Sequence, residues 1–284
     1  MKLYKQTEKI VPDFSMEKFL EQYSTSSVVS LESVDLFLAK VKDSLQAGVA
    51  KVYSDEPRYI EEMLSNKRAT IVKAREVKFQ YFGQETVSKP ESFSGYYTQY
   101  LKELLAVSNE VSHATDYLLD TLKMTVGTFI NEYNDDKHDQ IYGAVAYSNA
   151  AKKIDSHKKA IADYFKAPAG KVKTQVKDIL KSLQDMEVLY GQMEPIAEIF
   201  TDAKIKALGT KISSVTDMVD ALVQVNMTSG VLTKKKDSKE KLLTAIHTTA
   251  EYVEYYHALL AHWVFFCKAF TDLTKALEKF PSQS

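Results

Sequence analysis

The sequence of 284 residues is poor in the residues that interrupt secondary structure, with only nine Gly and six Pro. Because Gly and Pro are the strongest helix breakers, this scarcity predicts long helices joined by few turns. The single cysteine, Cys267, excludes a disulfide within the chain. A lone cysteine is also typical of an intracellular or virion setting.

The chain also lacks an excess of charge of either sign, because its formal net charge is −1. It therefore has no overall attraction to nucleic acid, and we expect no specific nucleic-acid recognition. The segment Met1–Pro12 has no long apolar core and does not resemble a classical signal peptide. We interpret residues 1–13 as an N-terminal arm and expect an intracellular (cytoplasmic) or virion location.

What the sequence does contain is long heptad patterns, and the longest lies within Asp237–Lys279. Asp237, followed three residues later by Glu240, forms a capping-box pattern that marks a helix start. Apolar and small residues then recur at alternating steps of four and three, which is the spacing of a coiled-coil seam. This seam consists of Leu242, Ile246, Thr249, Val253, Tyr256, Leu260, Trp263, Cys267, Phe270, Thr274 and Leu277.

The middle of this predicted helix, Tyr255–Cys267, is apolar or small on nearly every side. A helix with that pattern is buried all round, so we expect neighbours on each side. A membrane span is the competing interpretation. However, the charge-free run between Glu254 and Lys268 is only about 13 residues long, whereas a span needs about 20. We therefore expect no transmembrane segment.

A second heptad pattern predicts a long helix that ends near Tyr133. We expect a loop at Thr86–Glu91 before it, and before that loop a helix that ends at Phe82 with Gly83 as its stop. The seam of the second long helix consists of Tyr97, Leu101, Leu104, Ser108, Val111, Thr115, Leu118, Leu122, Thr125 and Phe129.

The rest of the chain shows no strand alternation longer than a few residues, and Ala167–Gly170 is its clearest turn. The sequence predicts an all-α fold, an elongated antiparallel helical bundle with several helices of about 25 to 40 residues. Residues 14–284 form one domain, with a sub-bundle junction near 167–170. Beyond this turn we expect helices at Lys171–Met193, at Ile196–Leu208 with Gly209 as a stop, and at Ser213–Val225.

Two Glu-x-x-His elements, Glu110–His113 and Glu254–His257, lie in the two predicted long helices. Carboxylate-bridged di-metal proteins take ligands from such elements, whose spacing places both side chains on one helix face. Here His113 lies opposite its seam and Glu254 points away from its own. Surface or hydrogen-bonded histidines explain the pattern better than a metal site, so no cofactor is predicted.

The segment Ala151–Lys181 is the most basic part of the chain, with nine lysines against three aspartates. It has no Arg and few aromatic residues, which argues against a nucleic-acid site. A solvated helical face is the simpler interpretation, and an anionic surface is the functional alternative for Lys152–Lys181. The candidate contact residues are Lys152, Lys153, Lys158 and Lys159.

Seventeen tyrosines are a high count, and three of them lie together at a predicted helix start: Tyr96, Tyr97 and Tyr100. Tyrosine suits both the edge of a core and a protein–protein interface. Both interpretations stay open, and we take these three residues as candidate interaction residues.

With long heptad seams, scarce Gly and abundant Tyr, the chain resembles the all-helical structural and internal proteins of large tailed bacteriophages. The resemblance spans the whole chain and implies a non-enzymatic structural or assembly protein, with other virion proteins or copies of itself as partners. A membrane-surface scaffold and a di-metal carboxylate oxidase are the alternative hypotheses. No residue pattern supports Ser/His/Asp or Cys/His catalysis.

Overall fold

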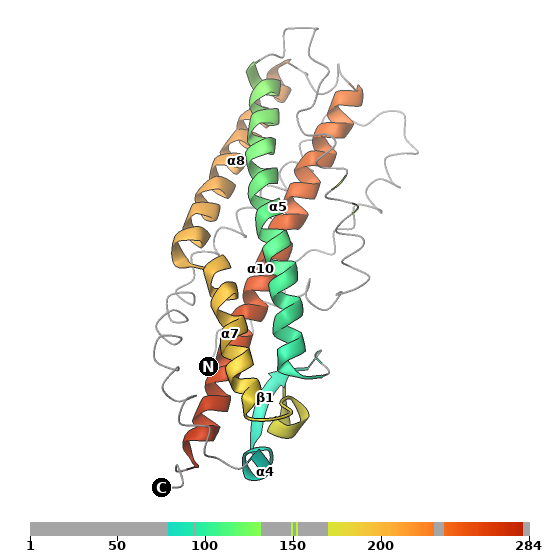
Figure 1. Ribbon diagram of the computed structural model, residues 1–284. Coiled ribbons are helices and arrows are strands. Elements are labelled where there is room, and N and C mark those ends of the chain that lie inside the picture. Colours follow the sequence, from blue (N-terminus) through green and yellow to red (C-terminus); the bar gives the residue numbers. More distant parts are fainter. Residues whose placement is uncertain are drawn as a thin grey trace, which may run out of the picture.

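A computed structural model describes residues 79–91, 93, 95–131, 149, 152, 170–229 and 236–280, and this part of the chain has an all-α fold (Figure 1). The predicted arm, most of the helices before Phe82 and most of the predicted junction lie outside these residues. The helices are α4 (Phe79–Phe82), α5 (Tyr97–Asn131), α7 (Gln184–Ile199), α8 (Asp202–Ser229) and α10 (Lys236–Glu278). A small sheet of β1 (Thr86–Pro90) and β2 (Lys171–Gln175) is followed by the short 3-10 helix η4 (Val176–Asp178).

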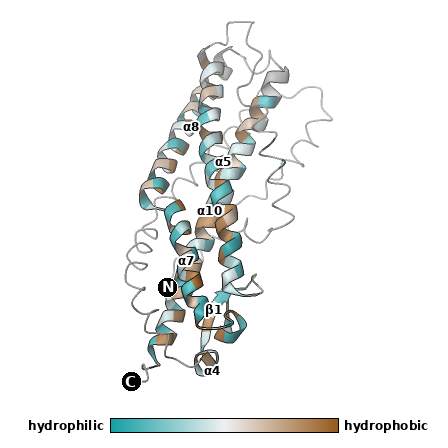
Figure 2. Ribbon diagram, in the orientation of Figure 1, coloured by the Kyte–Doolittle hydropathy of each residue, from teal (hydrophilic) through white to brown (hydrophobic). Residues whose placement is uncertain are grey.

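The two predicted long helices are confirmed as α10 and α5. Every residue of the α10 seam is buried, and of the α5 seam only Phe129 is partly exposed. No residue of Tyr255–Cys267 in α10 is classed as exposed. The heptad spacing therefore identified the buried faces of both helices. Figure 2 shows hydrophobic and hydrophilic residues on different sides of α5.

Helix α5 packs against α10, α7 and α8. It runs antiparallel to α10, because Tyr100 Oη is 2.8 Å from His262 Nδ1 while Thr115 Oγ1 donates to the earlier Tyr252 carbonyl at 3.3 Å. It runs parallel to α7 and α8 (Figure 1). The Tyr97 N–H at the start of α5 donates to the Ile179 carbonyl before α7, and Asp116, further along α5, pairs with Lys211 of α8. Helix α5 is therefore antiparallel to α10, as predicted for a pair in the bundle, and parallel to α7 and α8, which are not its neighbours in sequence.

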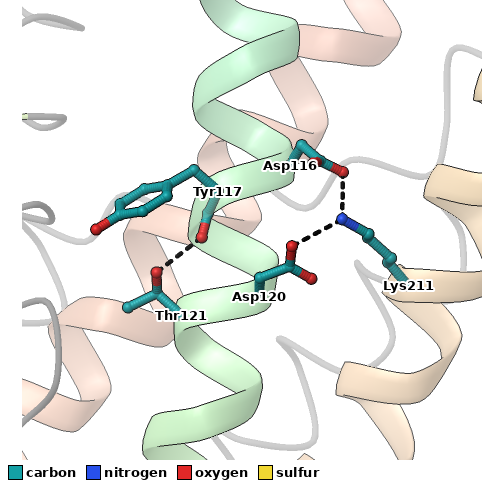
Figure 3. Close-up of polar contacts among 5 residues, drawn as sticks. All are labelled: Asp116, Tyr117, Asp120, Thr121 and Lys211. Atoms are coloured by element: carbon teal, nitrogen blue, oxygen red, sulfur yellow. Dashed lines mark hydrogen bonds and ion pairs between the residues drawn. The ribbon is translucent and has the colours of Figure 1, made fainter.

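Lys211 of α8 fixes the alignment of α8 with α5 (Figure 3). Its Nζ donates to Asp116 Oδ1 at 2.6 Å and to Asp120 Oδ2 at 2.8 Å, and these two carboxylates lie one turn apart on α5. Desolvation alone would lower the pKa of Lys211, but the hydrogen bonds and negative charges of the two aspartates outweigh it and the pKa is raised. All three side chains are about a third exposed or more, so the cluster contributes on the order of 1 kcal/mol.

Threonine side chains are buried in these helix contacts because each hydroxyl has a local acceptor. Thr115, Thr125 and Thr249 donate to the main-chain carbonyl four residues earlier, at 2.7 to 2.9 Å. A hydroxyl bonded in this way can replace an apolar residue in a seam without leaving a buried donor unpaired. This explains how the heptads tolerate threonine.

Two segments differ from the sequence-based prediction. β1 lies where a loop was expected at Thr86–Glu91, and β2 with η4 replaces the first part of the expected helix Lys171–Met193, so that α7 begins only at Gln184. The physical reason is the alternation Lys-Val-Lys-Thr-Gln-Val at 171–176, which places Val172, Thr174 and Val176 on one side of an extended chain.

The predicted stop at Gly209 is also wrong, because α8 continues through it to Ser229. The break lies earlier, at Phe200, whose backbone leaves the helical region with φ −106° and ψ 39°. Pro195 lies inside α7, four residues before its last residue, and Thr201 Oγ1 accepts from the Lys204 N–H at 3.3 Å. A hydroxyl in that position caps a new helix, so the Thr201 cap marks the start of α8 directly after the break.

Phe266 of α10 tests whether the α5–α10 contact stabilises the fold. Its ring is 1% exposed and packs on Tyr97 and Tyr100. We expect Phe266→Ala to lower the free energy of unfolding by about 3–5 kcal/mol, which is typical of a large aromatic residue removed from a core. Chemical denaturation followed by circular dichroism measures it.

The matched control is Tyr117→Ala on α5, whose side chain is 57% exposed. We expect this variant to lose less than about 1 kcal/mol. Equal losses for the two variants would contradict the central position of α10.

Candidate functional site at the two-stranded sheet

The aromatic side chains at the start of α5 form the support on which the small sheet lies. The ring of Tyr97 makes an edge contact with Phe266 at 5.2 Å between centroids, and the ring of Tyr100 stacks on Phe266 at 5.9 Å. Tyr100 also forms the buried 2.8 Å hydrogen bond with His262. The Tyr97 hydroxyl donates to the Ser88 carbonyl of β1 at 2.8 Å and so ties the sheet to the helices.

Of the three tyrosines predicted to contact a partner, the structure buries two. Tyr97 is 0% and Tyr100 2% exposed, whereas Tyr96 is 38% exposed. Tyr97 and Tyr100 are core residues, and only Tyr96 is available to another molecule. The prediction grouped them because they are close in sequence, but residues 96 and 97 point to different sides of the chain where α5 begins.

The outer edge of β1 is blocked at the Ser88 carbonyl and at Pro90. The register pairs Ser88 with Lys173 and Pro90 with Lys171. The hydrogen bonds from Val176 N to Glu85 O and from Glu91 N to Gly170 O flank this ladder, so the main-chain groups of Ser88 and Pro90 point away from β2. The Ser88 carbonyl is taken by Tyr97, and proline has no N–H to donate. Helix α10 also packs on β1.

The outer edge of β2 is open. By the same alternation, the main-chain groups of Val172 and Thr174 point to β1, and those of Lys171, Lys173 and Gln175 point away from it. Within the described ranges no residue forms a hydrogen bond with the outward main-chain groups of Lys171 and Lys173, whereas the Gln175 carbonyl, as the N-cap of η4, accepts the first hydrogen bond of that helix. Two of the three side chains, Lys171 and Lys173, are exposed. Toward the part of the chain that the structure describes, β2 therefore presents unpaired donors and acceptors at Lys171 and Lys173.

This edge is basic. Lys171, Lys173, Lys177 and Lys181 are all exposed, and Asp178 is the one acidic residue of Gly170–Lys181. No carboxylate of the described residues forms an ion pair with any of these four lysines; Asp178 accepts instead from Thr174 Oγ1. We call the outer edge of β2 with these four lysines the basic edge.

Two lysines of the basic edge lie over aromatic rings. Lys181 Nζ is 4.8 Å from the centroid of Tyr96, and Lys171 Nζ is 5.2 Å from the centroid of Phe265. Contacts of a cation with a ring face hold the long side chains in place while the charges stay accessible. Tyr96, the exposed member of the predicted group, thus belongs to this site.

The other predicted lysines are only partly covered. Lys152 is exposed and helical, whereas Lys153, Lys158 and Lys159 lie outside the described residues. The predicted basic segment Lys152–Lys181 is thus placed only at its C-terminal end, where it forms a strand edge rather than a helical face.

The four candidate metal ligands lie on α5 and α10 as predicted, but at different depths. Glu110 and His257 are partly buried, whereas His113 and Glu254 are exposed. Among the described residues, no group of three or more His, Cys, Asp and Glu side chains could hold a metal ion. The two Glu-x-x-His elements therefore do not converge on a common ion there.

Comparison of the chain with protein-family models, with curated proteins and with solved structures found no match. Within the described residues, no helix is long and apolar enough to cross a membrane.

Sequence reasoning missed the basic edge because it assigned Lys171–Met193 to a helix. The signal that could have found it is the six-residue alternation from Lys171 to Val176, which follows the turn at Ala167–Gly170. The partner strand carried a weaker signal, because Pro90 reads as a loop residue. Pro90 fits the strand because it lies at the edge that faces away from β2.

The buried tyrosines make the free energy of unfolding depend on pH in the alkaline range. Burial, with a smaller contribution from Glu110, raises the pKa of Tyr252 to about 12, and burial raises the pKa values of Tyr97, Tyr100 and Tyr256 further. An unfolded tyrosine ionises near pH 10. Between these values the native state keeps protons that the unfolded state loses, so stability is complete below about pH 10 and falls as pH rises toward 12.

We expect the free energy of unfolding to fall over this interval, and Tyr252→Phe to reduce the slope. Denaturation at several pH values, with tyrosinate absorbance as a second readout, measures it. Tyr117→Phe is the control, because that side chain is exposed. A free energy of unfolding that stays constant between pH 10 and about 12 would contradict the burial of these phenols.

Proposed function

We propose that this protein is a non-enzymatic structural or assembly protein that acts through contacts with other protein subunits. The observation that carries the proposal is the open outer edge of β2, since an unpaired strand edge is a template for pairing with another chain. Natural proteins usually cover or shorten such edges, as this chain does at β1 with Pro90, Tyr97 and α10.

The rigid support of the edge adds to this proposal. The sheet rests on buried aromatic rings of α5 and α10, and Tyr97 bonds directly to β1. A site on a fixed frame loses little conformational freedom when a partner binds, which favours affinity. The exposed Tyr96 beside the edge is of a residue type enriched at protein–protein interfaces.

A component of a bacteriophage virion, or a cytoplasmic assembly factor, is the more specific form of this proposal. It rests on the resemblance of the long heptad seams to all-helical virion proteins. In that setting the partners are other virion proteins or copies of this chain.

The exposed lysines favour one second function, binding to an anionic membrane surface. Lys171, Lys173, Lys177 and Lys181 supply the positive charge that such a surface attracts, at about 1 kcal/mol for each lysine near the lipid. Attraction to anionic lipid does not require an unpaired strand edge, so we rank protein contacts first.

Light scattering behind a sizing column tests the proposed function. The full chain has a mass of 32.1 kDa. We expect a larger defined mass, or a mass that rises with concentration, because an assembly protein associates reversibly. A monomer at every concentration restricts the proposal to a foreign partner, and a monomer that also turns over a small molecule contradicts it.

A further inference from the structure

We infer that the basic edge binds an extended acidic segment of a partner protein, which adds to the sheet as a third strand beside β2. This inference rests on the proposed function and specifies its partner. Strand addition at an open sheet edge is a common mode of peptide recognition: main-chain hydrogen bonds supply affinity, and alternate side chains supply specificity.

The main chain of β2 is ready for this pairing. Lys171 and Lys173 each direct an N–H and a C=O away from β1, and Gln175 adds an outward N–H, since its carbonyl belongs to the first turn of η4. An incoming strand can pair with this row without moving β1, whose own outer edge is closed at Ser88 and Pro90. The site therefore has one available side.

The positive charge of the basic edge favours an acidic strand. Lys171 and Lys173 project from the strand itself, and Lys177 and Lys181 follow in the next turns, with no described carboxylate paired to them. Opposite charges on neighbouring strands stabilise pairing, whereas like charges destabilise it. A strand with acidic side chains at alternate positions would place them opposite these lysines.

The same charges exclude two other occupants. Pairing of β2 with β2 of a second copy would place lysines beside lysines, and lysines on edge strands are a known device against such pairing. The N-terminal segment Met1–Pro12 contains three lysines and one glutamate, so it has the same sign as the basic edge. We therefore assign the edge to an acidic segment of a different protein.

Three of the neighbouring acidic side chains accept hydrogen bonds from other donors; a fourth, Glu91, places its carboxylate beside Gly170 without an ion pair to Lys171 among the described contacts. Glu85 Oε2 accepts from Lys279 Nζ at 2.6 Å, and Asp185 Oδ2 accepts from the main-chain N–H of Lys181 at 2.6 Å. Asp178 accepts from Thr174. None of these carboxylates forms an ion pair with the four lysines among the described residues, so an added acidic strand meets lysines that are available.

The experiment uses the full chain and a short labelled peptide of alternating glutamate and valine. Binding is measured by fluorescence anisotropy, with an alternating lysine and valine peptide as the control ligand. We expect binding of the acidic peptide alone, weakened by added salt because the contact is electrostatic in part. Equal binding of the two peptides, or no binding of the acidic one at low salt, would overturn the inference.

Amide hydrogen exchange distinguishes strand addition from simple attraction to lysines. We expect the bound peptide to slow exchange at Lys171, Lys173 and Gln175, while Val172 and Thr174 change little because β1 already protects them. Binding without slowed exchange at the three outward amides would show that the lysines act only as a charged surface, and would sink the inference.

Two pairs of variants separate charge from backbone pairing. Lys171→Glu with Lys173→Glu should weaken binding at least about tenfold, because attraction becomes repulsion. Lys102→Glu with Lys123→Glu is the matched control: it makes the same change in net charge at exposed sites on α5 and should leave binding within about twofold. Equal losses in both double variants would contradict a local site.

Lys173→Pro removes the lysine side chain and one outward N–H at a position that does not bond to β1, and Lys173→Ala removes the side chain with its charge but keeps the N–H. We expect the proline variant to bind several-fold more weakly than the alanine variant, because it also loses a hydrogen bond. Circular dichroism checks that both variants fold. If the proline variant does not fold, the hydrogen-exchange measurement on the unchanged protein still tests main-chain pairing. Equal binding by two folded variants would exclude main-chain pairing at this residue.

Vesicles of phosphatidylserine and phosphatidylcholine form the last comparison. Binding to these vesicles without binding to the acidic peptide would assign the lysines to a membrane surface and overturn the inference. Light scattering keeps this failure separate from that of the proposed function: a chain that forms oligomers but ignores the peptide loses the basic edge as its site and remains an assembly protein.

Discussion

The apolar contact between α5 and α10 determines where the other described elements lie. Its two heptad seams are buried almost throughout, and the hydrogen bonds of Tyr100 with His262 and of Thr115 with the Tyr252 carbonyl fix their antiparallel alignment. α7 and α8 then pack along α5 in its own direction, where Lys211 bridges Asp116 and Asp120. Burial of these seams supplies the main stabilising free energy, and the polar contacts set the relative positions of the helices.

The same contact positions the sheet. Phe266 of α10 packs on Tyr97 and Tyr100, and Tyr97 reaches from α5 to the Ser88 carbonyl of β1. A two-stranded sheet alone is marginally stable in water, so β1 and β2 depend on this support. The hydrogen bond that anchors the sheet also occupies the Ser88 carbonyl on the outer edge of β1, so one contact both stabilises the sheet and blocks that edge at this position.

A segment can be predicted from the sequence when its own residue pattern determines its structure. The seams of α5 and α10 repeat over many turns, so their length and buried faces could be predicted. β2 could have been predicted from its alternation, but its pairing with Thr86–Pro90 joins segments about 85 residues apart, and no local pattern states such a pairing. The burial of Tyr97 and Tyr100 beside an exposed Tyr96 likewise depends on Phe266 of α10, which is far from these tyrosines in the sequence.

The block at Pro90 makes the two edges of the sheet different. A strand can be added beside β2, whereas Pro90 and the Tyr97–Ser88 hydrogen bond block the outer edge of β1 at two positions, so pairing is favoured on one side of the sheet. In a stack of strands it would be a terminal unit: it accepts a neighbour on one side and stops growth on the other. A protein with this asymmetry limits the stoichiometry of what it binds, because each copy contributes one end.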